Sequence, residues 1–386
     1  MTGSILLPVV LFYIPKKGIF MGESNNNSLI NLEKISKNKE IVFVGRNWAL
    51  IFLIFMLILF SFLGENFFSL RNFNNIILGV SSLLLLASGE TFVIISKGID
   101  LSIGFVMGFV CVSSAIIMRD LNAAGYSPII SIMTGSIIGL LLGLIPGIIN
   151  GFLVAKLKVP PFIATLGMWG IANGLAWRLC EGFPIAFLPL QVRDIGNAYL
   201  AYFSPKEGFS FFIKPELTER KDILSLLKII PIPILWITFI LVIFAFILSR
   251  TKFGQHTYAI GGKVDAAIRA GINVPLHLIK IYVISSFFAA TAGVLLVFKL
   301  NMGVHTQYTS SYELFAIAAV VIGGASLMGG KGTIWGTVIG VLLIETLNNG
   351  LMMMGLPIFY RYIATGCILI IAVLIDQFFP ELVYRE

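Results

Sequence analysis

Long apolar stretches alternate with short polar breaks along most of this chain of 386 residues. A helix needs about 20 mostly apolar residues to cross the hydrocarbon core of a bilayer. Stretches of about this length predict roughly ten membrane helices, several of them short or broken by glycine, at 47–64, 74–96, 99–118, 128–155, 160–180, 229–249, 278–299, 312–328, 333–354 and 360–379. The pattern therefore predicts an all-α integral membrane protein.

The same pattern divides the chain into a membrane domain at residues 47–379 and two polar ends. Residues 1–46 are predicted to form a cytoplasmic segment, and residues 380–386 a cytoplasmic tail. The apolar run at 4–14 is too short for a span, and it lacks the preceding positive charges of a signal peptide. Its composition is compatible with a true start at Met21 and a misassigned extension before it.

The distribution of lysine and arginine predicts the orientation of the helices. Short cytoplasmic loops carry an excess of these residues. With the N-terminus inside, the inner loops receive most of them, and the short outer loops receive few. An even number of spans then places both termini in the cytoplasm, loop 181–228 outside and loop 250–277 inside.

A polar island at residues 251–271 separates two of the apolar runs. It carries three basic residues in its helical and loop positions, Lys252, Lys263 and Arg269, against one acid, Asp265. The Gly261–Gly262 pair predicts a turn. Residues 265–269 predict a short helix with small side chains on one face and charged side chains on the other. Such a helix on the positive side of the membrane indicates a surface for a soluble partner.

Composition supports this class of protein and excludes others. Of the residues, 58% are hydrophobic and 12% are charged, and the mean hydropathy is +0.95, whereas soluble domains have about 25% charged residues. The net charge of +8 reflects cytoplasmic loops and does not predict a nucleic-acid partner. The three cysteines and three histidines lack ligand spacing, so no metal or redox site is predicted.

Few acidic residues fall inside the predicted spans, namely Glu90, Asp100, Glu313 and Glu345, with Asp376 near the cytoplasmic end of the last span. A charge there costs about 2.5–3.5 kcal/mol on insertion scales and is a functional candidate. These acids form no relay across the membrane, and residues 329–333 lack the spacing of a phosphate-binding loop. The chain therefore shows no energy source of its own, and a transporter of this kind would need an external ATPase.

One helix face carries groups suited to a neutral polar solute. Phe162, Thr165, Trp169 and Asn173 are spaced i, i+3, i+7 and i+11, so they share a face. Aromatic rings with sparse hydrogen-bonding groups suit sugars, while packing or interfacial anchoring is the alternative interpretation. Asn348 and Asn349 likewise suit either a ligand contact or an interhelical hydrogen bond.

Two glycine-rich breaks, at residues 98–104 and 329–336, each enter a predicted span. Paired interruptions in two halves of a membrane protein point to a transport path. Close packing of helices at glycine is the alternative explanation.

Several segments together resemble the permease subunits of monosaccharide ABC importers of the ribose, galactose and xylose type. They are GIDLSIG at 98–104, NGFLVAK at 150–156, VPPFIATLG at 159–167, TKFG at 251–254, YAIGG at 258–262, AGIN at 270–273, YELFAIAA at 312–319, GGASLMGGKGT at 323–333 and NNGL at 348–351. The resemblance covers residues 75–376 in order. Phe315 departs from it, because the family usually has an acid there.

The resemblance implies a noncatalytic, multi-pass subunit of the bacterial cytoplasmic membrane, paired with a second permease copy as a homodimer or heterodimer. It implies a sugar-binding protein outside, lipid around the spans, and an ATPase inside that binds ATP with Mg²⁺, while this chain binds no cofactor. The implied ATPase-coupling residues are Tyr258, Ala259, Gly261, Gly262, Ala266, Ala267 and Gly271. The candidate translocation path comprises Asp100, Phe162, Thr165, Trp169, Asn173, Glu313 and Asn348.

Other functions remain as alternatives at this stage. The same fold could import a nucleoside or another small polar solute, and the aromatic Phe315 leaves that choice open. A self-powered secondary carrier and a membrane scaffold without transport activity belong to different classes. The missing acid relay and the polar island both favour the ATP-driven importer over a secondary carrier.

Overall fold

The computed structural model describes residues 47–215, 222, 225–305 and 312–378. Helices occur there at each of the ten predicted stretches: α3 (Trp48–Leu63), α4 (Leu70–Ile95), α5 (Ile103–Ala123), α6 (Pro128–Ala155), α7 (Pro161–Cys180), α10 (Ile232–Arg250), α13 (Val274–Leu300), α14 (Tyr312–Ile322), α15 (Ile334–Met353) and α16 (Ile358–Phe378). Among the described residues, α4, α5, α6, α10, α13 and α15 are long and apolar enough to cross a membrane. The predicted segments 1–46 and 380–386 lie outside the described residues.

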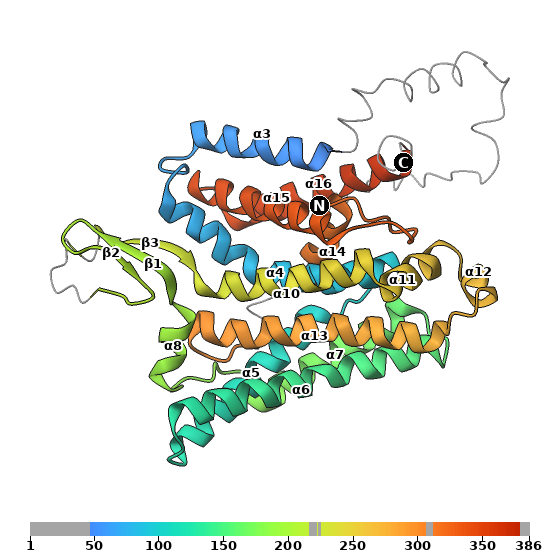
Figure 1. The fold of residues 1–386 in the computed structure, drawn as a ribbon, viewed down its shortest axis with the longest axis horizontal. Helices are drawn as coiled ribbons and strands as arrows, with labels where there is room; N and C mark the ends of the chain where they lie inside the picture. Colours follow the sequence, from blue (N-terminus) through green and yellow to red (C-terminus); the bar gives the residue numbers. More distant parts are fainter. Residues whose placement is uncertain (1–46, 216–221, 223–224, 306–311, 379–386) are drawn as a thin grey trace, which may run out of the picture.

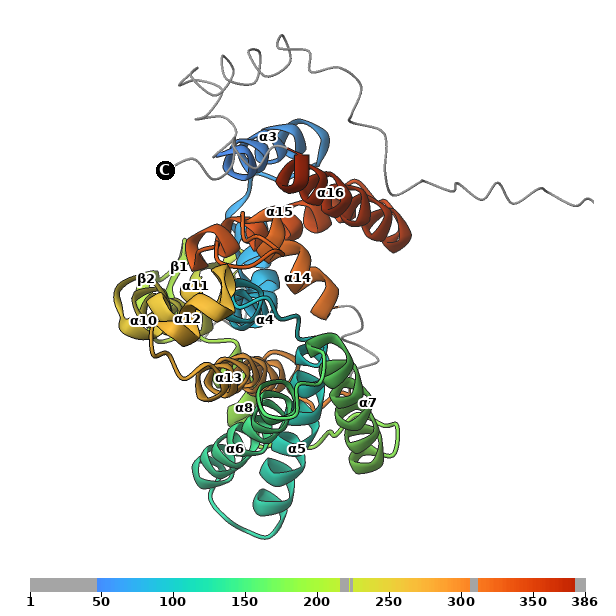
Figure 2. The same cartoon turned by 90° about the vertical axis from the view of Figure 1, so that its right-hand side faces the viewer.

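The helices form one elongated bundle (Figure 1). α6 and α13 lie side by side along its length, and α5 packs against both. The view down the bundle places α3, α15 and α16 together on one flank and α5, α6 and α7 on the other (Figure 2). α3 begins and α16 ends toward the end of the bundle that carries the polar island (Figure 1).

A stripe of glycines explains how closely α6 approaches its neighbours. A glycine recurs every four residues along one face of α6, at Gly135, Gly139, Gly143, Gly147 and Gly151. A Cβ at Gly147 would lie 2.5 Å from the carbonyl oxygen of Tyr282 on α13. Small residues at this spacing let helix backbones approach closely in membranes, so the stripe holds α6 against α5 and α13.

The loop at residues 181–228 corrects the all-α prediction. It holds a short helix, α8 (Leu190–Gly196), and three strands that extend just past it: β1 (Tyr199–Ser204), β2 (Gly208–Phe211) and β3 (Leu227–Pro231). The sheet is antiparallel in the order β2-β1-β3, with Ala201 opposite both Phe211 and Ile229. Aromatic residues favour strands, and Gly208, at φ +76°, allows the turn into β2.

The polar island also differs from its prediction. It contains two helices, α11 (Lys252–Gly262) and α12 (Val264–Arg269), of which only the second was expected. The predicted turn at Gly261–Gly262 is wrong, because α11 continues through both glycines and the chain turns at the extended Lys263. The Thr251 side chain caps α11 by accepting from the Gly254 amide at 3.5 Å, and α13 begins at Val274, earlier than predicted.

The eighth predicted helix is shorter than its apolar run. α14 ends at Ile322 instead of residue 328. Gly324 follows with φ +89°, a conformation that glycine adopts easily and other residues avoid. Residues 323–333 therefore form an irregular segment before α15, and this segment lies at the same end of the bundle as α11.

Candidate functional site

The glycine-rich break at 329–336 meets the end of α4, directly before the break at 98–104, beside α11. The amide of Gly330 donates to the carbonyl of Ile95, at the end of α4, over 2.8 Å. The Nζ of Lys97 donates to the carbonyl of Gly262 at 3.2 Å, and the hydroxyl of Tyr258 donates to the carbonyl of Gly332 at 2.8 Å. We call this meeting point the glycine junction, formed by Ile95, Lys97, Tyr258, Gly261, Gly262, Gly329, Gly330 and Gly332.

Backbone contacts define the glycine junction. A Cβ at Gly261 would overlap the carbonyl oxygen of Ile95 and lie 2.5 Å from the amide nitrogen of Gly330. Burial raises the pKa of the Tyr258 hydroxyl above its usual value, so this group stays protonated and able to donate. At Gly261, α11 therefore packs directly against the end of α4 and against the segment 323–333, with no side chain between the backbones.

The seven predicted coupling residues divide between two faces of α11 and α12. Gly261 and Ala267 are buried, and Ala267 packs with Ile260 and Val274. Tyr258 is half-buried, and the exposed members are Ala259, Gly262, Ala266 and Gly271. The exposed face also carries Val264 and Ile268, which are 40% and 56% exposed. Sequence reasoning missed these two, although their i, i+4 spacing indicated a shared face.

The inner face of α11 is joined to α13. The hydroxyl of Thr257 and the Nε2 of His277 lie 2.9 Å apart, and the His277 ring packs against Phe253 at 4.4 Å between centroids. All three groups are at least half-buried. A displacement of α11 would thus be transmitted to α13 as well as to the breaks.

A buried polar network surrounds Asp100, in the segment between α4 and α5. Its Oδ1 accepts from the amide and hydroxyl of Ser102, at 3.0 and 2.6 Å, and its Oδ2 accepts from the Ser285 hydroxyl at 2.9 Å. The Asp100 amide donates to Oε1 of Glu90 at 3.0 Å. Asn150 donates to the Ser102 hydroxyl at 3.1 Å. We call Glu90, Asp100, Ser102, Asn150, Tyr282 and Ser285 the Asp100 cluster.

Four of the candidate path residues gather around the Asp100 segment and the first turn of α5. Asp100 lies in the segment itself, and Thr165 donates to the carbonyl of Ile99 at 3.1 Å. Trp169 packs on Phe105 with ring centroids 4.4 Å apart. The Glu313 carboxyl lies against Gly104, where a Cβ would be 2.5 Å from its Oε2. The structure thus brings α5, α7 and α14 together at this point.

The remaining path candidates lie apart from the Asp100 segment and the start of α5. Phe162 is 53% exposed on α7. Asn173 and Asn348 are half-buried on α7 and α15. Beside Asn348, Asn349 exchanges two hydrogen bonds of 3.0 Å with Asn72 of α4, which confirms the interhelical interpretation for Asn349.

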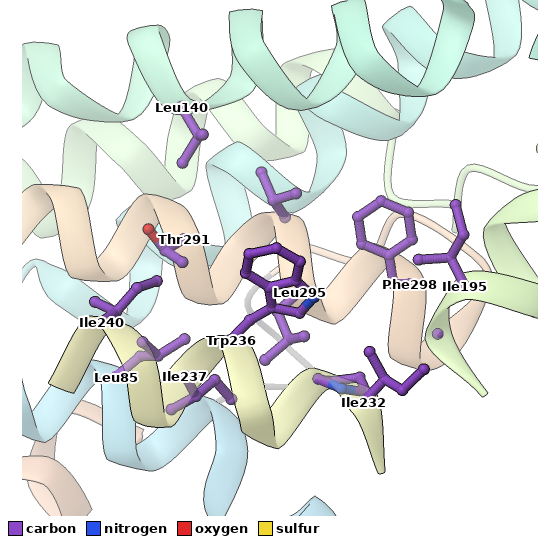
Figure 3. Close-up of a pocket in the computed structure, with 13 residues that line it drawn as sticks. Leu85, Leu140, Ile195, Ile232, Trp236, Ile237, Ile240, Thr291, Leu295 and Phe298 are labelled. Atoms are coloured by element: carbon purple, nitrogen blue, oxygen red, sulfur yellow. The ribbon is translucent and has the colours of Figure 1, made fainter. Parts of the chain in front are cut away.

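A separate cavity of about 280 Å³ lies between α4, α6, α8, α10 and α13 (Figure 3). Its lining is apolar, with Trp236 of α10 and Leu295 of α13 facing the same space. The hydroxyl of Thr291 already donates to the carbonyl of Phe287 at 2.8 Å. This cavity offers few hydrogen-bonding groups and is a poor site for a polar solute.

Comparison with known proteins identifies relatives over most of the chain. The family model described as branched-chain amino acid transport system / permease component matches residues 72–373. The ribose import permease protein of Bacillus subtilis is 39% identical over 325 residues, covering 84% of this chain and 90% of the relative. The xylose transport system permease protein of Haemophilus influenzae is 34% identical over 347 residues, covering 80% and 90%.

A third relative extends the similarity to another sugar. The galactose/methyl galactoside import permease protein of Haemophilus influenzae is 31% identical over 361 residues, covering 90% of this chain and 98% of the relative. No solved structure matches the chain.

Proposed function

The chain belongs to this family of membrane transport permeases, and from that premise we propose that it is the membrane-spanning subunit of an ATP-driven sugar importer. The observation that carries the proposal is similarity over at least four-fifths of the chain to permeases named for ribose, xylose and galactose. The substrate is then a simple sugar, carried across the bacterial cytoplasmic membrane by alternating access.

The exposed face of α11 and α12 is the proposed docking surface for the ATPase. Val264 and Ile268 supply apolar contact area there, and Lys263, Asp265 and Arg269 supply charges around them. Apolar centres with polar rims are typical of protein interfaces. ATP with Mg²⁺ would be bound by that partner, and the permease itself would perform no covalent chemistry.

The glycine junction is the proposed route from the ATPase to the membrane. Movement of α11 acts directly on the end of α4 through Lys97 and on the segment before α15 through Tyr258. Both segments are irregular backbone at the ends of spans, which can change shape at lower cost than a continuous helix. The Asp100 segment follows Lys97 immediately, so the motion would reach the residues gathered around α5.

Two further partners complete the proposed importer. A second permease copy, identical or related, would enclose the path together with this chain. A sugar-binding protein would deliver the solute at the opposite end of the bundle, where α8 and the three-stranded sheet lie (Figure 1). Phe209, Phe211 and Phe212 are each about two-thirds exposed in that sheet region, at 66%, 65% and 64%.

Import of a nucleoside is the second candidate function. Phe315 of α14 stacks on Tyr362 of α16, with ring centroids 5.8 Å apart and planes at 15°. Aromatic faces of this kind suit a planar base, and Phe315 stands where the sugar permeases usually carry an acid. No such pair is needed for ribose alone, so substrate identity has to be measured directly.

Competition for uptake tests both candidates. Cells expressing the full transporter would be supplied with radiolabelled ribose and challenged with excess xylose, galactose, adenosine or uridine. The proposal expects ATP-dependent ribose uptake that sugars suppress and nucleosides leave intact. Suppression by nucleosides alone would favour the second candidate, and uptake that persists after ATP depletion would contradict an ATP-driven importer.

A further inference from the structure

The cavity of about 280 Å³ separates α10 from α13 toward the end of the bundle that carries the sheet (Figure 3). The two helices touch where Phe244 of α10 meets Phe287 and Phe288 of α13, with ring centroids 5.8 and 4.7 Å apart. The cavity begins one turn closer to the sheet, where the helices no longer fill the space between them. α8 closes its other end, since a Cβ at Gly196 would overlap the carbonyl oxygen of Phe298.

The cavity lies at the depth of the hydrocarbon core of a bilayer. α10 lines it from Ile232 to Ile240, and α13 lines it from Thr291 to Phe298. Both helices are long and apolar enough to cross a membrane. The segment from Ile232, the first residue of α10, to Ile240 is about 12 Å long at 1.5 Å per residue. One leaflet provides about 15 Å of the hydrocarbon core, so the cavity has the length and the place of an acyl chain in that leaflet.

The lining suits hydrocarbon and does not suit water. Besides the indole nitrogen of Trp236, the only polar side-chain group in it is the hydroxyl of Thr291, which already donates to the carbonyl of Phe287. A buried water needs about two to four hydrogen-bonding partners. An empty apolar cavity, in turn, costs its lining atoms their dispersion contacts on one side. Inside a membrane, the apolar material that can fill such a space is the acyl chain of a lipid.

The helix faces beside the cavity lack the residues with which membrane helices usually pair. Interfaces between membrane helices are enriched in small residues. Large apolar side chains, among them Trp236 and Phe239, dominate the exposed face of α10, and α10 contains no glycine. The glycines of α6 pack against α5 and α13. Exposed glycines that meet nothing within 4 Å lie instead on α7, at Gly167, Gly170 and Gly174. The surface around the cavity is therefore one that faces lipid and not a second permease copy.

We propose that this cavity binds one acyl chain of a membrane phospholipid. The chain lies between Trp236 of α10 and Leu295 of α13, which face the same space (Figure 3). The lining recognises the acyl chain and not a particular headgroup. α10 ends at Arg250 and α11 begins at Lys252, so the bound chain steadies the helix that continues into the polar island. The inference holds whichever solute the transporter carries.

Lipid binding to the purified permease tests the proposal without any transport assay. The chain would be delipidated in detergent and titrated with dioleoyl phosphatidylglycerol or dioleoyl phosphatidylcholine. Native mass spectrometry would count the retained lipid, and thermal unfolding would give Tm. The expected result is about one lipid per chain and a saturable rise in Tm of about 2–4 °C with either headgroup. Glycerophosphocholine, which has no acyl chain, should have no effect.

A matched pair of substitutions separates the cavity from the rest of the lipid-facing surface. Thr291→Phe fills the cavity, so it should raise Tm in the absence of lipid and abolish both lipid responses. Thr238→Phe, at an exposed position of α10 outside the lining, should behave as wild type. If Thr291→Phe fails to fold, Trp236→Ala and Phe239→Ala form a second pair, because both aromatic residues are exposed. Only Trp236→Ala should weaken lipid retention, by about tenfold.

The proposal is overturned if phospholipid neither remains bound to the wild-type chain nor raises its Tm. It is also overturned if Thr291→Phe and Thr238→Phe retain equal amounts of lipid, or, in the second pair, if Trp236→Ala and Phe239→Ala do. Light scattering during size-exclusion chromatography covers the other occupant. A wild-type dimer that forms without lipid and is lost with Trp236→Ala would show that a second copy of this chain covers the cavity, and it would equally refute the lipid site.

Discussion

Replacing Gly261 by alanine tests whether the glycine junction depends on direct backbone contact. The added methyl group would overlap the carbonyl oxygen of Ile95 and lie 2.5 Å from the Gly330 nitrogen. Both neighbours are backbone atoms, so neither can rotate away as a side chain would. α11 must therefore move away from the ends of α4 and of the 323–333 segment.

The size of the effect follows from what that movement disrupts. Overpacking of this kind costs about 1–3 kcal/mol. The 2.8 Å bond from Gly330 to Ile95 lies directly under the new methyl group, and its loss adds about 0.5–1.5 kcal/mol. We expect a destabilisation of about 2–4 kcal/mol and a decrease in Tm of about 5 °C or more for the purified permease.

Gly262→Ala is the matched control, one residue further along the same helix. A Cβ at Gly262 would meet nothing within 4 Å, and alanine is the better helix former by about 1 kcal/mol. Its Tm should equal or slightly exceed that of the wild-type chain. Thermal unfolding of both variants in one detergent is the assay, and equal Tm values for the two would refute the packing argument.

Three further changes test other contacts. Lys97→Gly should keep or raise Tm, because Lys97 has a φ of +66° that glycine adopts at lower cost. The same change should reduce ATP-dependent uptake, because it removes the hydrogen bond to the Gly262 carbonyl. Full uptake would show that the lysine side chain is dispensable. Asn349→Leu should destabilise the permease by about 1–3 kcal/mol, since it leaves the Oδ1 of the buried Asn72 without a donor while the Asn72 Nδ2 keeps its bond to the Phe67 carbonyl. Asn72→Leu added to it should restore part of the loss in Tm, and no restoration would mean that the amide pair is not the cause. Ile268→Asp should leave Tm unchanged but impair ATPase binding, because Ile268 is 56% exposed; a Tm well below wild type would instead place Ile268 in the core.

The helices were predictable because their signal is local. Each needs a run of apolar residues, and each of the predicted runs holds a helix in the described part of the chain, at α3 to α7, α10 and α13 to α16. Local signals misled at one place and were missing at another. The Gly261–Gly262 pair has the sequence of a turn but continues α11, because its backbone packs against α4. The strands β1 to β3 depend on pairing between separate segments, which no single run of the sequence shows.

The candidate site was predictable in its parts but not in its arrangement. The sequence singled out Glu90 and Asp100 as intramembrane acids, and it paired the two glycine-rich breaks. Their partners are distant in the chain, since Ser285 lies 185 positions from Asp100 and Tyr258 lies 74 positions from Gly332. Neither hydrophobic period nor residue spacing reports contacts over such separations. Lys97 and Ser285 were therefore missed as members of the site, whereas Ser102, only two positions from Asp100, could have been found from its place in the chain.

The central claim is that α11 and α12 join this permease to an ATPase, and co-purification tests it most directly. The tagged chain would be isolated in mild detergent from cells that express its transporter, and the proteins retained with it would be identified by mass spectrometry. The account predicts an ATPase with two nucleotide-binding domains, lost with Ile268→Asp and retained with Phe211→Asp. Phe211 is 65% exposed and belongs to β2, which lies at the opposite end of the bundle (Figure 1). A wild-type chain that retains no ATPase, or an Ile268→Asp chain that retains it fully, would contradict the account.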